Sequence, residues 1–268
     1  MSSTVPTLDQ SVGASVDQRR VPRLGGFNTT LFGLELRRML RNKRTLFFTL
    51  LFPPALLFAF GSGSDMNESV GHGNVSAYIM VSMALYGAAI TTAVAGSSVA
   101  LERAVGWSRQ LRLTPLHPMA YIATKALCAL ALGALAVGAV NVAGIAQGNA
   151  DMSVARWVAC AVLALLCSSV FAALGLFVGY VVPGENAMQV LGPGLAVLAF
   201  LGNVFIPISE GTVMWHVASL TPMFGVAEIS RAPLTGELPW YAVVNALVWV
   251  SVFVAGAAWR MSKDTGRV

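Results

Sequence analysis

The chain has 268 residues, of which 56% are hydrophobic and only 11% are charged, whereas an average soluble domain carries roughly 25% charged residues. This composition excludes a water-soluble globular protein, and a membrane β-barrel is excluded because alternating segments of about ten residues do not occur. Basic residues beside membrane spans explain the net charge of +5 better than nucleic-acid binding does, so we predict an all-α polytopic membrane protein.

Residues 1–27 are polar and aperiodic, and we expect them to form a disordered cytoplasmic tail. From Thr29 to Lys43 the apolar residues repeat with helical spacing, and arginines occupy another face (apolar: Phe32, Leu36, Met39, Leu40; basic: Arg37, Arg41, Arg44). This pattern is typical of an amphipathic helix in the membrane interface, capped by Asn28, Thr29 or Thr30. A plain juxtamembrane anchor is the alternative.

Six apolar runs follow, and about 20 residues suffice to cross a bilayer. The first run contains Pro53-Pro54 and is expected to be kinked or locally unwound. The fifth contains Gly192-Pro193-Gly194, which predicts a break or a kink. The predicted spans cover residues 45–60, 75–100, 119–147, 157–181, 187–206 and 240–259 of a transmembrane domain over 28–260, and residues 261–268 form a cytoplasmic tail.

Other polar residues fit around these spans. The segment 207–239 is too interrupted to cross, and two pieces of it (213–220 and 223–231) are predicted to be short helices on the surface. Lys125 is expected to reach the headgroups. Hydroxyl groups in the second span are expected to bond helix carbonyls or neighbouring helices (Thr91, Thr92, Ser97, Ser98).

The distribution of charge predicts the orientation. Six spans place both termini on one side, which then holds fifteen basic residues, against two (Arg156 and Arg231) beside six acids on the other. Positive charge marks the cytoplasmic side. Both termini and the segment between the second and third spans are therefore predicted to lie in the cytoplasm, at the plasma membrane.

That segment, residues 101–116, is polar and long enough for about three helical turns. Its arginines Arg109 and Arg112 are suited to pair with acids on a partner, and Trp107 is suited to be a buried anchor there. Thr114-Pro115 ends a helix sharply. The alternative is an interfacial helix whose arginines and tryptophan meet headgroups.

Glu102-Arg103, Gly106 and the run 111–116, followed by Tyr121 and Lys125, resemble the motif after the second span in permease subunits of ABC type-2 exporters. The family pattern is roughly Glu-Arg-Glu-x-Gly-Thr-x-x-x-Leu-x-x-Thr-Pro, and the chain departs from it at Ala104 and Trp107. The order of parts over about 28–260 is similar too. The nearest branch is the bacterial drug-resistance branch, typified by anthracycline-resistance permeases.

The resemblance implies a role for each part. The segment 101–116 would be a coupling helix that inserts into a separate ATP-binding-cassette ATPase (Glu102, Arg103, Gly106, Trp107, Arg109, Arg112, Thr114, Pro115). The N-terminal helix would be a connecting helix that touches the same subunit (Leu36, Arg37, Leu40, Arg41). ATP and Mg would be bound by that ATPase, a second permease, identical or not, would complete the unit, and the short helices before the last span would cap the exit.

The chain itself offers no catalytic residue, cofactor site or metal site. Its cysteines lie in apolar runs, its histidines lack ligand spacing, and no Gly-x-x-x-x-Gly-Lys-Ser/Thr phosphate loop occurs. Because the spans lack charge, we expect an exporter of hydrophobic or amphiphilic compounds such as a drug, an antibiotic or a lipid-like molecule. Candidates for the pathway, equally suited to joining helices, are Asn141, Asn203 and Asn245.

Two other functions compete with this expectation. A proton-coupled multidrug carrier usually needs a carboxylate or histidine inside the membrane, and the predicted spans contain neither. An intramembrane enzyme is less favoured, because no histidine lies within a span to activate a serine.

Overall fold

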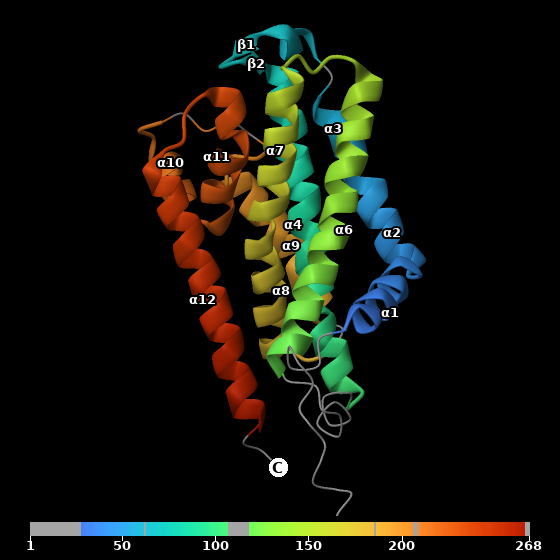
Figure 1. Cartoon of the computed structure of the whole chain (residues 1–268). Helices are drawn as coiled ribbons and strands as arrows, with labels where there is room; N and C mark the ends of the chain where they lie inside the picture. Colours follow the sequence, from blue (N-terminus) through green and yellow to red (C-terminus); the bar gives the residue numbers. More distant parts are fainter. Residues whose placement is uncertain are drawn as a thin grey trace, which may run out of the picture.

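The computed structural model describes residues 28–61, 63–106, 118–184, 186–205, 208 and 210–265. These residues form an elongated bundle of helices with one short hairpin, so the all-α prediction is confirmed (Figure 1). Four described segments are long and apolar enough to cross a membrane, and a shorter apolar helix accompanies them: Val75–Ala104, Met119–Gln147, Val154–Val181 and Trp240–Lys263, with Asn186–Leu201. The predicted tail 1–27 lies outside the described residues.

One helix precedes the first predicted span, and the span itself is made of two further helices. Helix α1 (Thr29–Leu40) begins after Asn28, whose side chain accepts a hydrogen bond of 2.9 Å from the backbone N–H of Thr30, which confirms the predicted cap. Helices α2 (Lys43–Leu50) and α3 (Phe52–Phe60) then meet at Leu51. Proline lacks an N–H group and clashes with the preceding turn. Pro53 and Pro54 accordingly lie in the first turn of a new helix, and the chain is locally unwound just before them, as predicted.

A short hairpin joins α3 to α4. After the 3₁₀ turn Ser64–Asn67, strands β1 (Ser69–Val70) and β2 (Gly73–Asn74) pair antiparallel. The side chain of Asn74 accepts a hydrogen bond of 2.9 Å from the N–H of Ala77, which caps α4, and donates one of 2.7 Å to the carbonyl of Asn149. One asparagine thus fixes the start of α4 and attaches it to the loop before α7.

Helix α4 (Val75–Ala104) is the centre of the bundle. It packs against α3, α6 (Pro118–Gln147), α7 (Val154–Cys167) and α8 (Ser169–Val181). Helices α7 and α8 adjoin at Ser168, inside the predicted span 157–181, and the Ser168 carbonyl accepts a hydrogen bond of 2.9 Å from the Thr92 hydroxyl. Thr91 and Ser97 also make the expected hydroxyl bonds, whereas the Ser98 hydroxyl is buried without a described partner.

The backbones of α4 and α8 touch through glycine. A Cβ atom placed on Gly175 would lie 2.0 Å from the carbonyl oxygen of Ala93, and one on Gly96 would lie 2.5 Å from that of Ala172. Small residues permit such close approach of helices in a membrane. These two helices therefore behave as one packed unit.

The last helices correct two predictions. Helix α9 (Asn186–Leu201) runs through Pro193 without a break, because spanning helices tolerate proline when their surroundings satisfy the freed groups; the alternative of a kink stays a prediction. Helix α10 (Val213–Ser219) lies on the surface as predicted, but α11 (Pro222–Thr235) is buried, with Met223, Val226 and Leu234 completely enclosed. Helix α12 (Trp240–Thr265) returns along the bundle and takes in residues 261–265 of the predicted tail.

We predict that Gly175→Ala destabilises the protein by about 1–3 kcal/mol, the usual cost of overpacking, because the new methyl group meets a backbone oxygen. The matched control is Gly138→Ala, since nothing lies within 4 Å of a Cβ at Gly138. Thermal unfolding in detergent measures both variants. Equal melting temperatures for the two would contradict close packing of α4 and α8.

Candidate functional site

Two ends of the bundle can be distinguished. Figure 1 shows α1, the last turn of α4, the first turn of α6 and the last turn of α12 at one end, called here the α1 end. The hairpin β1–β2, α10 and α11 lie at the opposite end, called the hairpin end. The motif Glu102-Arg103 belongs to the last turn of α4 and hence to the α1 end.

Glu102 lies in an ion cluster that joins three helices; Glu102 and Lys125 are buried in it, whereas Arg38 keeps 55% of its side chain exposed. Lys125 on α6 donates hydrogen bonds from its Nζ atom to Oε1 of Glu102 on α4 and to Oε1 of Glu35 on α1. Nη2 of Arg38 lies 3.0 Å from Glu102 Oε1, and the Tyr121 hydroxyl donates to Glu102 Oε2. Two acids and two bases balance in charge, so the cluster is neutral.

The position of Lys125 corrects the prediction that it reaches the headgroups. Its side chain is 2% exposed and Glu102 is 4% exposed. An unpaired ammonium group in this interior would cost several kcal/mol. Because Glu35 and Glu102 approach from two other helices, the burial of Lys125 is compensated by two charge-assisted hydrogen bonds.

Arg103, the next residue, joins α4 to a further helix, α8. Its Nη1 atom donates to the carbonyls of Gly179 and Tyr180 at 3.2 and 2.9 Å, and its guanidinium lies 5.2 Å from the centre of the Tyr180 ring. These carbonyls belong to the last turn of α8, where the helix dipole favours a cation. Glu102 and Arg103 thus fix one turn of α4 to α1, α6 and α8.

The predicted coupling segment is divided by the end of this helix. Residues 101–104 continue α4, which ends at Ala104, and Gly106 follows with φ +74°. That left-handed conformation suits glycine. The other residues predicted to contact an ATPase lie outside the described residues (Trp107, Arg109, Arg112, Thr114 and Pro115).

The predicted connecting helix uses both of its faces. Leu36 and Leu40 are half-buried and pack, with Met39, on a cluster that includes Ala129 and Leu132 of α6. Arg37 and Arg41 are exposed. The apolar face of α1 therefore contacts the bundle, and the basic face is available to a partner or to lipid headgroups.

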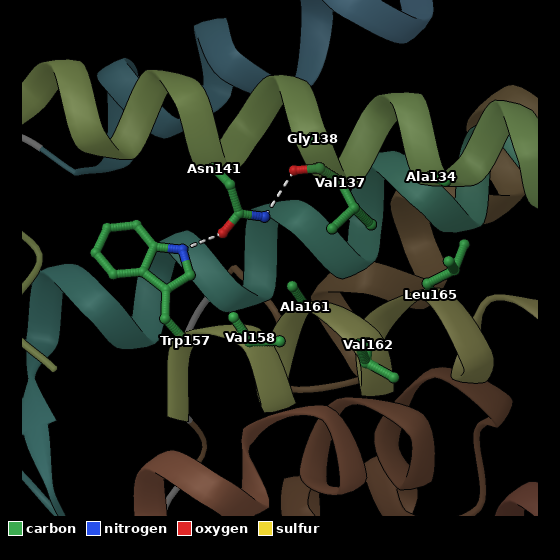
Figure 2. A pocket seen from close by; sticks show the side chains of 9 residues that line it. All are labelled: Ala134, Val137, Gly138, Asn141, Trp157, Val158, Ala161, Val162 and Leu165. Carbon is green, nitrogen blue, oxygen red and sulfur yellow. Dashed lines mark hydrogen bonds between the residues drawn. The ribbon is translucent and has the colours of Figure 1, made fainter. Parts of the chain in front are cut away.

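Each of the three asparagines proposed for the pathway is engaged within the chain. Figure 2 shows Asn141 in an apolar groove of about 370 Å³ between α6 and α7, where it donates to the Val137 carbonyl and accepts from the Trp157 indole N–H. Asn245 donates to the Ser219 carbonyl at 2.8 Å. Asn203 belongs to the cluster described next. Their role in a pathway stays a prediction.

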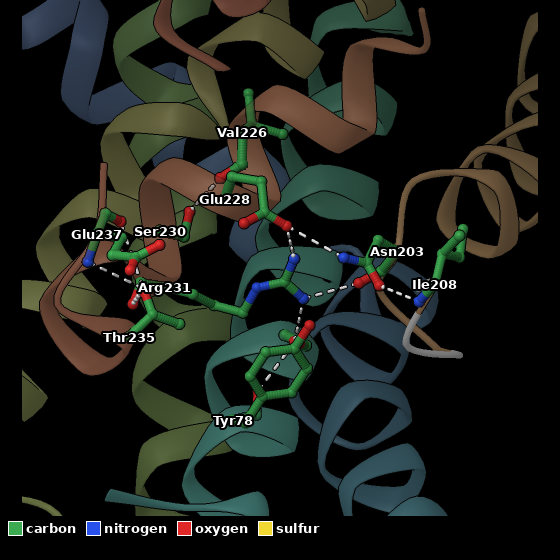
Figure 3. Close-up of polar contacts among 10 residues, drawn as sticks. Tyr78, Asn203, Ile208, Val226, Glu228, Ser230, Arg231, Thr235 and Glu237 are labelled. Atoms are coloured by element: carbon green, nitrogen blue, oxygen red, sulfur yellow. Dashed lines mark hydrogen bonds and ion pairs between the residues drawn. The ribbon is translucent and has the colours of Figure 1, made fainter. Parts of the chain in front are cut away.

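A second buried ion pair lies at the hairpin end. Arg231 on α11 is 1% exposed, and its Nη2 atom lies 2.6 Å from Oε1 of Glu228. Its Nη1 atom donates to the Asn203 carbonyl at 2.7 Å and to the Ser82 hydroxyl at 3.2 Å, and its guanidinium stacks 4.4 Å from the centre of the Tyr78 ring (Figure 3). The cluster connects α11 with α4 and with the turn after α9.

Neither cluster is predicted from the sequence. Arg231 is expected there as a charge on the surface, and no role is expected for Glu35. One signal was available for the second cluster, because Glu228 and Arg231 stand three residues apart in an otherwise apolar helix, the spacing of a helical ion pair. No local pattern relates Glu35 to Lys125, which are 90 residues apart.

Residues 28–235 match the model of the family described as ABC-2 type transporter. The chain belongs to this family. It is also 26% identical over 228 residues to the protein named "Putative transport permease YvfS" of Bacillus subtilis (strain 168), a match that covers 82% of this chain and 91% of that protein. The chain is thus a membrane transport subunit of an ABC transporter, and the family implies an ABC ATPase as its partner.

We predict that Arg231→Met destabilises the protein by about 3 kcal/mol, the lower end of the range for breaking a buried ion pair, because Glu228 keeps 22% of its side chain exposed. Thermal unfolding in detergent measures the change. Arg41→Met, which removes an exposed arginine, is the control and should have the same melting temperature as the wild type. An unchanged melting temperature for Arg231→Met would contradict a structural role of this pair.

Proposed function

We propose that this permease belongs to an exporter that moves hydrophobic or amphiphilic compounds out of the cell, with ATP and Mg bound by the separate ATPase. The observation that carries the proposal is the fixed last turn of α4. Glu102 and Arg103 hold it against three other helices, directly before the segment 107–117. A force applied to that segment therefore acts on a rigid support rather than on a flexible loop.

The arrangement of the helices supports the proposed topology of six spans with both termini in the cytoplasm. Helix α1 begins and α12 ends at the α1 end (Figure 1). The exposed basic residues of α1 lie there as well (Arg37, Arg38, Arg41), and positive charge favours the cytoplasmic side. In this topology α2 and α3 together form the first span, and α10 and α11 lie near the outer surface.

The surface of the spans supports an apolar cargo and a second permease. Helix α12 is mostly exposed along its length, and its exposed residues are largely apolar (Val244, Leu247, Val248, Val252, Val254). Lipid, a second permease subunit or both would cover this face. The buried charged residues at the α1 end and at the hairpin end are paired within the chain. An apolar molecule that crosses the bundle would therefore meet no unpaired buried charge from these two clusters.

The alternative of a proton-coupled carrier has gained one supporting observation. Glu35 and Glu102 lie in the interior rather than in solvent, and buried carboxylates are the usual proton carriers of such machines. Both are held by ion pairs with Lys125 and Arg38. The source of energy separates the two functions directly.

Inverted membrane vesicles that contain the permease and its ABC ATPase should accumulate doxorubicin when ATP is supplied. Uptake should continue after an ionophore collapses the proton gradient and should stop with vanadate or a non-hydrolysable ATP analogue. Vesicles with the ATPase alone are the control. Uptake that depends on the proton gradient and not on ATP would contradict the proposed exporter and would favour the proton-coupled carrier.

We predict that Trp107→Ala and Arg109→Glu each weaken binding of the ATPase by about thirtyfold or more, because a buried aromatic or arginine anchor is worth at least about 2 kcal/mol. Co-purification and titration of the detergent-solubilised permease with the ATPase measure this. The control is Arg156→Glu, since Arg156 lies in the first turn of α7, which begins at the hairpin end. Wild-type affinity in both variants would contradict a docking role for the segment 107–117.

A further inference from the structure

We propose that Glu35, Lys125 and Tyr121 are positioning residues that, with Glu102 and Arg103, form a rigid joint between α1, α4, α6 and α8. The joint rests on the proposed function, because it transmits the movement of the docked ATPase. It gives the Glu102-Arg103 motif a role inside the permease rather than a contact with the partner.

Burial supports this internal role. The side chain of Glu102 is 4% exposed, and its two carboxylate oxygens are engaged by Lys125, Arg38 and Tyr121. A partner side chain would have to displace Arg38, Lys125 or Tyr121 to reach it. A partner can instead bind the segment 107–117, which begins five residues after Glu102, and leave the cluster intact.

Helix α1 depends strongly on these ion pairs for its orientation. No residue of α1, all of which the structure describes, is fully buried. Leu36, Met39 and Leu40 provide a partly buried apolar contact, which is non-directional. The bonds from Glu35 and Arg38 to Lys125 and Glu102 are directional and charge-assisted, so they determine how α1 is set against α6.

The joint also has a path along which movement can travel. Glu102 and Arg103 lie on α4, whose backbone touches α8 at Gly96 and Gly175. Packed helices move as units rather than deforming continuously. The opposite end of α4 carries Tyr78 and Ser82, which contact Arg231 of α11. A tilt of the last turn of α4 would therefore reach α11 at the hairpin end.

The test compares Lys125→Met with Lys125→Arg in the full permease, assembled with its ABC ATPase in proteoliposomes. Lys125→Met should bind the ATPase with wild-type affinity, because the docking segment is unchanged. It should lower both the stimulation of ATP hydrolysis by the permease and the ATP-dependent uptake of doxorubicin by about tenfold, within the usual range of coupling energies. Lys125→Arg, which keeps the charge, should retain most of both activities.

A double variant separates positioning from stability. Glu102→Gln combined with Lys125→Met removes both charges, so it should melt closer to the wild type than Lys125→Met does. Coupling should stay low in the double variant, because no ion pair then joins α4 and α6. If coupling instead recovers together with the melting temperature, the cluster serves stability alone and the joint is wrong.

Further variants make the outcome decisive. If Lys125→Met fails to reach the membrane, Glu35→Gln replaces it as the test of the joint. Glu35 lies on α1 and is 13% exposed, so its substitution disturbs the interior less than that of Lys125. It should also bind normally and couple poorly. Lys263→Met, on α12 at the same end, is the control and should behave as the wild type.

Two further results would overturn the joint. One is full coupling in Lys125→Met or Glu35→Gln, and the other is loss of ATPase binding in a variant that melts normally. A wild-type permease that neither binds nor stimulates an ABC ATPase would instead refute the proposed function, and the joint with it. Stimulation without doxorubicin uptake would change only the cargo and would leave the comparison of variants valid.

Discussion

The close contact between α4 and α8 is the constraint on which the rest of the structure depends. Gly175 places its backbone against the Ala93 carbonyl, and Gly96 places its own against the Ala172 carbonyl. In a bilayer, lipid tails are as apolar as the helices, so association relies on close packing and hydrogen bonds. Helix α4 is thereby enclosed by its neighbours, and charged side chains packed near both of its ends are buried and must be paired.

Each end of α4 carries one neutral ion cluster. At the α1 end, Glu102 pairs with Lys125 and Arg38, and at the hairpin end, Tyr78 and Ser82 receive Arg231, which is paired with Glu228. Ion pairs of this kind add little net stability compared with apolar packing, but removing one partner is costly. Their value here is geometric, because each cluster joins α4 to other helices: Glu102 binds Lys125 of α6 and Arg38 of α1, and Arg231 of α11 contacts Tyr78 and Ser82.

The proposed coupling to an ATPase depends on where Glu102 and Arg103 lie on α4 more than on any single residue. The proposed docking segment begins directly after the turn that carries Glu102 and Arg103. Motion of a docked partner would therefore enter the bundle at its most buried helix, and the same helix contacts α11. A permease without a nucleotide-binding motif of its own needs such a connection if ATP hydrolysis on another subunit is to open a path between the membrane faces.

The sequence by itself determined the class and the order of the parts. Apolar runs of membrane length, the cap at Asn28 and the pair Pro53-Pro54 predicted helices and a break that the structure contains, because these signals act over a few neighbouring residues. The motif around Glu102 was sufficient to indicate an ABC type-2 permease, which the match over residues 28–235 confirmed.

Only the tertiary structure decided where the charges lie. Lys125 was expected at the headgroups and α11 on the surface, yet both are buried, because their partners come from residues far away in the sequence. A charged residue looks exposed in a local pattern, and its burial is permitted only when the fold supplies an opposite charge. Glu35 and Lys125, 90 residues apart, become neighbours through the packing of α1 against α6, which no local spacing encodes.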